Sequence, residues 1–227
     1  MAKSCDSVAA DLDMEPPSSA QPIIVLASRS PRRIDLLTKF LDEVFGEGVM
    51  SFAIEPADID ETPLAHETPL SHVQRLAQSK AQVIAQRLSG SDVVVIAADT
   101  TVDVDGRIYG KPADIDEARV MLNEMSGRSH KVHTAVSVVR GDQQAHTVDS
   151  ATVTMVSISP EQMDWYLATG ESLDKAGAYA LQGDGGRLVE SVQGGFHTVV
   201  GLPLGPLGEL LAQCGLSWKN GDRKSVV

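Results

Sequence analysis

The clearest pattern in the chain is an apolar run, Ile23 to Ala27, that leads through a short polar segment into a helix-like repeat. Apolar residues recur there at helical spacing: Ile34, Leu36, Leu37, Phe40 and Leu41. Ser30 is a natural N-cap residue, and Pro31 suits the first turn of a helix. The pattern therefore predicts a buried strand followed by a helix that begins near Pro31.

A second helix is predicted from Leu70 to Leu88, after a start at Thr68-Pro69. Lys80 stands in its apolar stripe and can be interpreted in two ways. Its stem can lie at the edge of the stripe with the ammonium in water, or the ammonium can be delivered into a cleft. The sequence leaves both interpretations open.

The run Val93 to Ala98 is continuously apolar and mostly β-branched, which predicts a strand covered on both faces. It leads into Asp99 and Thr100. In open α/β sheets, ligands gather beyond the carboxyl ends of strands, so these two polar residues are expected at a functional edge. A short extended segment from Phe52, followed by an acidic loop that contains Glu61, is predicted between the two helices.

The rest of the chain alternates strands and helices. Strands are predicted on both sides of the Asp105-Gly106 turn, over Val132–Val139 and Val148–Val156, and at Leu188–Val192 and Thr198–Val200. Helices are predicted after Asp114, from Ser159 to about Thr169, and from Gly205 to Cys214. A second lobe is expected to begin near Val132. Residues 22–227 are therefore expected to form one α/β domain, and residues 1–21, rich in Ser, Asp and Pro, a flexible extension.

Composition narrows the class of partner. The chain has 227 residues, 42% hydrophobic content and a formal net charge of −12, which argues against a general nucleic-acid or anionic-membrane surface. Cys5 and Cys214 lie near opposite ends and match no zinc or redox spacing. With no signal-like segment and no apolar run of about 20 residues, a cytoplasmic protein is expected.

Charged residues near the predicted strand ends indicate phosphate and metal chemistry. Arg32 and Arg33 at a helix start oppose the macrodipole unless an anion sits there, although a solvated basic helix start is the alternative. Lys80 and Lys111 supply further cations. Glu61 and Asp99 are a carboxylate pair that could hold Mg²⁺, although a solvated loop residue and a turn carboxylate are the alternatives. P-loop, HExxH and G-x-S-x-G motifs are absent from the sequence.

Taken in order, the motifs resemble the Maf family of nucleoside triphosphate pyrophosphatases, from Ile23 to about Leu211. They are Leu26-Ala27-Ser28-Arg29-Ser30-Pro31-Arg32-Arg33, Ala98-Asp99-Thr100-Thr101-Val102, Gly110-Lys111-Pro112, Met125-Ser126-Gly127-Arg128, Asp174-Lys175-Ala176-Gly177-Ala178-Tyr179 through Gln182-Gly183, and Val199-Val200-Gly201-Leu202-Pro203. The resemblance implies an elongated α/β fold with a central mixed sheet flanked by helices and two lobes around a cleft.

The resemblance also implies a reaction. Water would attack the α-phosphorus of a nucleoside triphosphate and release pyrophosphate, with Mg²⁺ or Mn²⁺ as the divalent cation. Asp99 would be the proton acceptor and, with Glu61, would form the metal side of the site. Ser28, Arg33, Lys80 and Lys111 would be the phosphate-side groups.

Among the branches of the family, the chain resembles the one acting on dTTP and UTP. The Gln182 amide offers a donor and an acceptor that can pair with O4 and N3–H of uracil or thymine. Arg32 and Thr100 match the other positions linked to base choice. The alternatives are a 7-methyl-GTP pyrophosphatase and a non-catalytic nucleotide-binding regulator of cell division, and a homodimer is considered as the assembly. Arg29 stands where the family commonly has a smaller residue.

Overall fold

The computed structural model describes residues 22–88 and 92–216. The first part contains β1 (Ile23–Leu26), α1 (Pro31–Phe45), β2 (Phe52–Ile54) and α2 (Pro69–Leu88). The second part contains β3 (Val93–Val104), β4 (Arg107–Tyr109), α3 (Ile115–Met125), β5 (Ser129–Arg140), β6 (Gln143–Met155), α4 (Pro160–Ala168), β7 (Val189–Gln193), α5 (Phe196–Val200) and α6 (Leu204–Gln213). Short 3₁₀ turns at Glu171–Asp174, Ala176–Ala178 and Asp184–Leu188 lie between α4 and β7.

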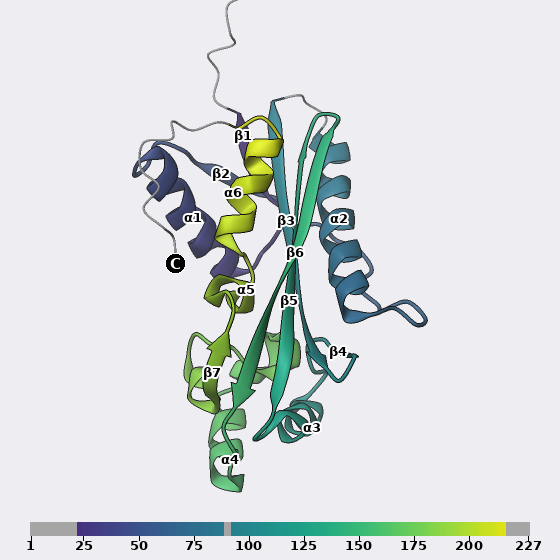
Figure 1. The fold of residues 1–227 in the computed structure, drawn as a ribbon, viewed down its shortest axis with the longest axis vertical. Helices are drawn as coiled ribbons and strands as arrows, with labels where there is room; N and C mark the ends of the chain where they lie inside the picture. The colour runs from purple at the N-terminus through teal and green to yellow at the C-terminus, as the bar shows by residue number, and fades with distance from the viewer. Residues whose placement is uncertain (1–21, 89–91, 217–227) are drawn as a thin grey trace, which may run out of the picture.

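Seven strands form one mixed sheet with helices on both sides (Figure 1). The strand order is β2-β1-β3-β5-β6-β7, with β4 paired to β3. β1 pairs in parallel with β2 and β3, whereas β3, β5, β6 and β7 are joined by antiparallel pairing. The expected α/β fold with a central mixed sheet flanked by helices is confirmed.

Successive residues of β3 point to opposite faces of the sheet, and different helices cover these faces. Ile96 and Ala98 pack in a core with α1 and α6, which lie together in Figure 1. Val95 and Ala97 pack instead against Ala81 of α2 and its neighbours. The alternation explains the uninterrupted apolar run, because both faces of this strand are buried.

The sheet carries two large hydrophobic cores along its length. One includes Leu37, Ile96 and Val138 and lies at the end of the molecule with α1 and α6. The other lies toward α3 and α4 and includes Leu122 and Tyr166. β3 and β5 contribute residues to both, so these strands run through the whole elongated body (Figure 1).

Three expectations are corrected by this architecture. β3 does not end at Asp99 but continues to Val104, because β5 pairs with it as far as Asp103. The second core draws on Val102, before the expected start of a lobe near Val132. The segment Thr198–Val200 is part of helix α5 rather than a strand.

The expected extension, residues 1–21 with Cys5, lies outside the described residues. Cys214 is buried in the first core as a free thiol. Within the described ranges, the helices lack the combination of length and apolarity that a bilayer crossing requires.

Candidate functional site

A cavity of about 570 Å³ lies where β1 ends and the chain turns into α1. Residues 27–33 form one wall, and the loop after β2 contributes Pro56 to Ile59 and Glu61. Lys80 and Asp99 line it from α2 and β3, and residues 174–176 approach from the other end of the molecule. A cavity of this volume is large enough for a nucleotide-sized ligand.

The walls of the cavity carry an excess of positive charge in a protein whose net charge is −12. The six cationic side chains are Arg29, Arg32, Arg33, Lys80, Lys111 and Lys175, and the four carboxylates are Asp58, Glu61, Asp99 and Asp174. Such local enrichment concentrates the electrostatic field on a polyanion. The sequence-predicted cations therefore converge on one cavity.

The start of α1 forms the anion-facing wall. Pro31 is its first residue, as predicted, but the Ser30 side chain makes no capping hydrogen bond. Instead, the Ser30 amide donates to Ser28 Oγ at 3.2 Å, which folds the turn back on itself. The first turn contains no acidic residue, so within this turn nothing offsets the repulsion between the Arg32 and Arg33 charges and the positive end of the helix dipole. An anion at this helix start would resolve that repulsion.

Arg33 joins the α1 start to the rest of the fold. Its Nε donates to the Gly201 carbonyl at 2.8 Å, and Nη2 donates to Thr100 Oγ1 at 3.0 Å. A longer contact, 3.4 Å, links Nη1 to Ser28 Oγ. Burial lowers the pKa of Arg33, and the nearby Asp99 charge opposes that shift. Arg33 is thus a structural link as well as a cation of the cavity.

Lys80 connects the two predicted carboxylates. Its Nζ lies 2.6 Å from Glu61 Oε1 and 2.7 Å from Asp99 Oδ1. The Lys80 and Asp99 side chains are only 9% and 10% exposed, whereas Glu61 is 52% exposed. Of the two interpretations of Lys80, the structure supports the second, because the buried stem delivers the ammonium into the cavity.

The Glu61 carboxylate is held in its charged form. Desolvation raises its pKa, but the hydrogen bond from Lys80 and the charges of Lys80, Lys111 and Arg33 outweigh this, so the pKa is lowered. Asp99 provides a second carboxylate on the same ammonium.

This donor set fits a Mg²⁺ ion that takes its other ligands from water and phosphate oxygens, because such sites use one or two protein carboxylates. Within residues 22–88 and 92–216, no cluster of three or more His, Cys, Asp or Glu residues suited to a metal occurs.

Comparison with known proteins places the chain in a family. The family model described as Maf-like protein matches residues 23–214. The chain belongs to the Maf family. Relatives named dTTP/UTP pyrophosphatase include one from Myxococcus xanthus, 47% identical over 196 residues, which cover 86% of this chain and 94% of that protein. Another, from Methylobacillus flagellatus, is 46% identical over 194 residues with the same two coverages of 86% and 94%. A third, from Symbiobacterium thermophilum, is 42% identical over 192 residues, covering 85% and 94%.

In this Maf protein, Thr100 and Arg32 line a smaller cavity of about 60 Å³ beside the first. Thr100 Oγ1 lies 2.9 Å from Thr134 Oγ1, which donates to the Thr198 carbonyl at 2.6 Å. This chain of contacts fixes the Thr100 hydroxyl beside Arg33. Thr100 of β3 and Arg32 of α1, which the resemblance links to base choice, therefore line the same small cavity.

Gln182 is exposed and lines neither cavity, although the preceding residue, Leu181, lines the smaller one. The assignment of Gln182 as the reader of the base stays a prediction. Lys111 is exposed at the larger cavity and is the least enclosed of its predicted cations.

Sequence reasoning missed Lys175, which lines both cavities of the Maf protein and pairs with Asp174. Desolvation raises the pKa of Asp174, but Lys175 and Arg32 lower it more strongly. The signal was present in the Asp174-Lys175-Ala176-Gly177 motif. In the sequence analysis it carried no site assignment for Lys175.

Proposed function

We propose that this Maf protein hydrolyses dTTP and UTP to the nucleoside monophosphate and pyrophosphate. The observation that carries the proposal is the Lys80 ammonium held between Glu61 and Asp99, beside the cation-lined start of α1. The names of its relatives, dTTP/UTP pyrophosphatase, support the substrate class.

The phosphate groups would be bound by Arg33, Lys80 and Lys111, with the Ser28 turn shaping the wall against which they lie. Mg²⁺ or Mn²⁺ held by Glu61 and Asp99 would neutralise charge on the phosphate oxygens. Because the triphosphate is a polyanion, its binding would be strongest where the cavity carries its excess of cations.

Asp99 is the proposed proton acceptor. A water oxygen forms a bond to the α-phosphorus, the bond from that phosphorus to the bridging oxygen breaks, and pyrophosphate leaves. The water proton passes to Asp99, whose Oδ1 is already oriented by Lys80. Lys80 would also offset the negative charge that gathers on the reacting phosphate.

The test is pyrophosphate release from dTTP, UTP, CTP, GTP and 7-methyl-GTP, with and without Mg²⁺, in H₂¹⁸O. We expect dTTP and UTP to give the highest kcat/KM and the ¹⁸O label to appear in the monophosphate. Asp99→Asn should lower kcat roughly 10²–10⁴-fold with an unchanged circular dichroism spectrum. Preference for 7-methyl-GTP would overturn the substrate assignment, and label in pyrophosphate would overturn attack at the α-phosphorus.

A further inference from the structure

The loop between β2 and α2 carries Glu61 into the cavity without regular secondary structure of its own. Ordering a residue in such a loop costs about 1–2 kcal/mol of backbone entropy, so other contacts must hold it. The Lys80 bond to the Glu61 carboxylate is one such contact. A metal that binds the Glu61 carboxylate, or a phosphate that binds the Lys80 ammonium, would compete with that bond, so by itself the bond would be a weak support during the reaction.

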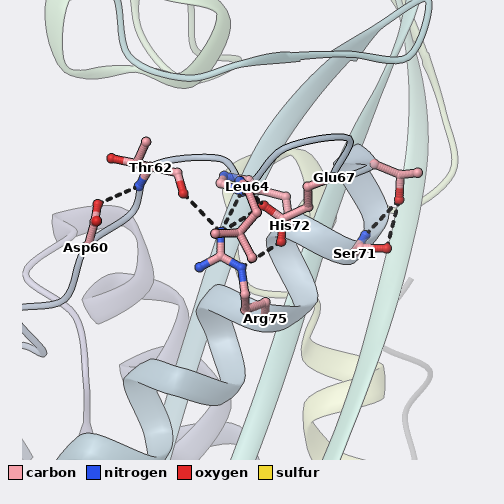
Figure 2. Close-up of polar contacts among 8 residues, drawn as sticks. Asp60, Thr62, Leu64, Glu67, Ser71, His72 and Arg75 are labelled. Carbon is pink, nitrogen blue, oxygen red and sulfur yellow. Dashed lines mark hydrogen bonds and ion pairs between the residues drawn. The ribbon is translucent and has the colours of Figure 1, made fainter.

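A second support lies at the start of α2 (Figure 2). The Glu67 side chain is only 6% exposed and is bound by Arg75 through a two-point contact. Arg75 Nε lies 2.6 Å from Glu67 Oε1, and Nη2 lies 2.8 Å from Oε2. His72 Nδ1 lies 3.0 Å from the same Oε2. The geometry is the paired fork that makes Arg–carboxylate contacts strong and directional.

This pair holds the loop by its backbone rather than by a side chain. Arg75 Nη2 donates to the Thr62 carbonyl at 3.2 Å, and the Leu64 amide donates to Glu67 Oε2 at 2.9 Å. On the other side of Glu61, Asp60 Oδ1 accepts from the Thr62 amide at 2.9 Å (Figure 2). Residue 61 therefore lies within a segment fixed at residue 62, its immediate neighbour.

Arg75 and Lys80 belong to the same helix, α2. Arg75 binds the backbone carbonyl of Thr62, the residue after Glu61, and Lys80 binds the carboxylates of Glu61 and Asp99. One helix therefore contacts both the backbone next to Glu61 and the Glu61 carboxylate itself. The backbone support does not involve the Glu61 carboxylate, so it would persist when that carboxylate binds a ligand.

We propose that Arg75 and Glu67 are positioning residues that hold Glu61 in place for the divalent cation. The proposal rests on the proposed function for its kinetic consequence. A purely structural pair would stabilise the fold without changing how the site responds to metal. A positioning pair changes that response, and outer partners of metal ligands typically alter affinity or activity about 10–100-fold when they are removed.

The test compares Arg75→Met, Arg75→Lys and Arg119→Met. Arg119 pairs with Asp164 at 2.8 Å between α3 and α4, outside the residues that line the cavity, and serves as the control for loss of an Arg–carboxylate pair elsewhere. Arg75→Met should raise the Mg²⁺ concentration for half-maximal dTTP hydrolysis about 10–100-fold. Arg75→Lys keeps the charge but loses the two-point contact, so its Mg²⁺ concentration for half-maximal hydrolysis should lie between those of Arg75→Met and wild type. Arg119→Met should have the same Mg²⁺ dependence of dTTP hydrolysis as wild type.

A double-mutant cycle with Glu61→Gln decides whether Arg75 acts through Glu61. Once the Glu61 carboxylate is gone, Arg75→Met should add no further shift in metal dependence. Full additivity of the two substitutions would overturn the proposal. Equal shifts in Arg75→Met and Arg119→Met would overturn it as well, because they would reflect a general loss of stability.

Hydrogen exchange separates this proposal from the proposed function. In Arg75→Met, the amides of Thr62 and Leu64 should exchange faster than in wild type and in Arg119→Met. Unchanged exchange would overturn the proposal whether or not the enzyme hydrolyses dTTP. If the wild-type protein released no pyrophosphate, the proposed function would fail, and the same cycle would then be measured by Mn²⁺ binding. If Arg75→Met unfolds, Arg75→Lys carries the comparison.

Discussion

Replacing Lys80 with Met tests how the two carboxylates of the cavity are held together. Methionine keeps most of the aliphatic length that packs in the stripe of α2 but removes the ammonium. Asp99, only 10% exposed, would lose the cation at 2.7 Å and keep only the longer-range attraction of Arg33. Glu61 is 52% exposed and could turn toward water at little cost.

The expected magnitude follows mainly from Asp99. Breaking a buried ion pair by removing one partner typically costs 3–5 kcal/mol. We expect about 3 kcal/mol here, at the low end, because the pair borders an open cavity rather than a closed core. For a domain of this size the loss corresponds to a fall in Tm of roughly 6–12 °C.

The assay is thermal and urea unfolding of Lys80→Met beside Lys111→Met. Both variants remove one cation from the same cavity, but Lys111 is exposed, so its loss should cost less than about 0.5 kcal/mol. Adding Mg²⁺ should recover part of the lost stability in Lys80→Met, because a cation that binds only the folded state stabilises it. Equal stabilities of the two variants would refute the reasoning that Lys80 compensates a buried charge.

Three further outcomes are expected. Gln182→Glu should reduce kcat/KM for UTP and dTTP at least about 10-fold while GTP turnover is maintained, because the substitution replaces the amide donor by an acceptor. An unchanged ratio of kcat/KM between these substrates would remove Gln182 from base recognition. Arg33→Ala should lower triphosphate use. It should also lower the free energy of unfolding by roughly 1–3 kcal/mol, because the Gly201 carbonyl loses its donor. An unchanged Tm in thermal scans would contradict this. The hydrogen bond from Arg75 lowers the Glu67 pKa below its ordinary 4.5. The free energy of unfolding lost in Glu67→Gln should therefore be constant at neutral pH and should shrink as the pH falls below 4.5. A difference between wild type and Glu67→Gln that does not change with pH in urea titrations would exclude this linkage.

Local pattern was sufficient for most elements and for one unusual side chain. The apolar run before Ser28 and the stripe of α1 are visible in the sequence because both faces of β1 and one face of α1 are buried. Lys80 could be singled out because a charged residue interrupts an otherwise apolar stripe. Its two partners could be proposed as a pair, but only the fold brings Glu61 and Asp99 to the same ammonium.

Where pairing partners decide the structure, the sequence was a poorer guide. Asp99 was expected at the end of a strand because the apolar run stops there, yet β5 pairs with β3 well beyond it. Thr198–Val200 is β-branched and was expected in a strand, but the segment forms α5, whose last turn is closed by the Gly201 amide donating to the His197 carbonyl at 2.9 Å. Tertiary pairing decided the first case, and a local helical hydrogen bond closes the second segment.

The strands that run through both hydrophobic cores bear on how the protein folds. β5 and β6 are joined by a two-residue turn, Gly141-Asp142, and stay paired from Arg140 and Gln143 back to Ser129 and Thr154. This hairpin needs only short loop closures, so it can form before β1 and β3 are recruited from earlier in the chain. The hairpin contributes residues to both hydrophobic cores. Loss of the hairpin would therefore disrupt both cores together. The elongated molecule is therefore expected to unfold in a single cooperative transition, with the hairpin as the last part to lose protection from exchange.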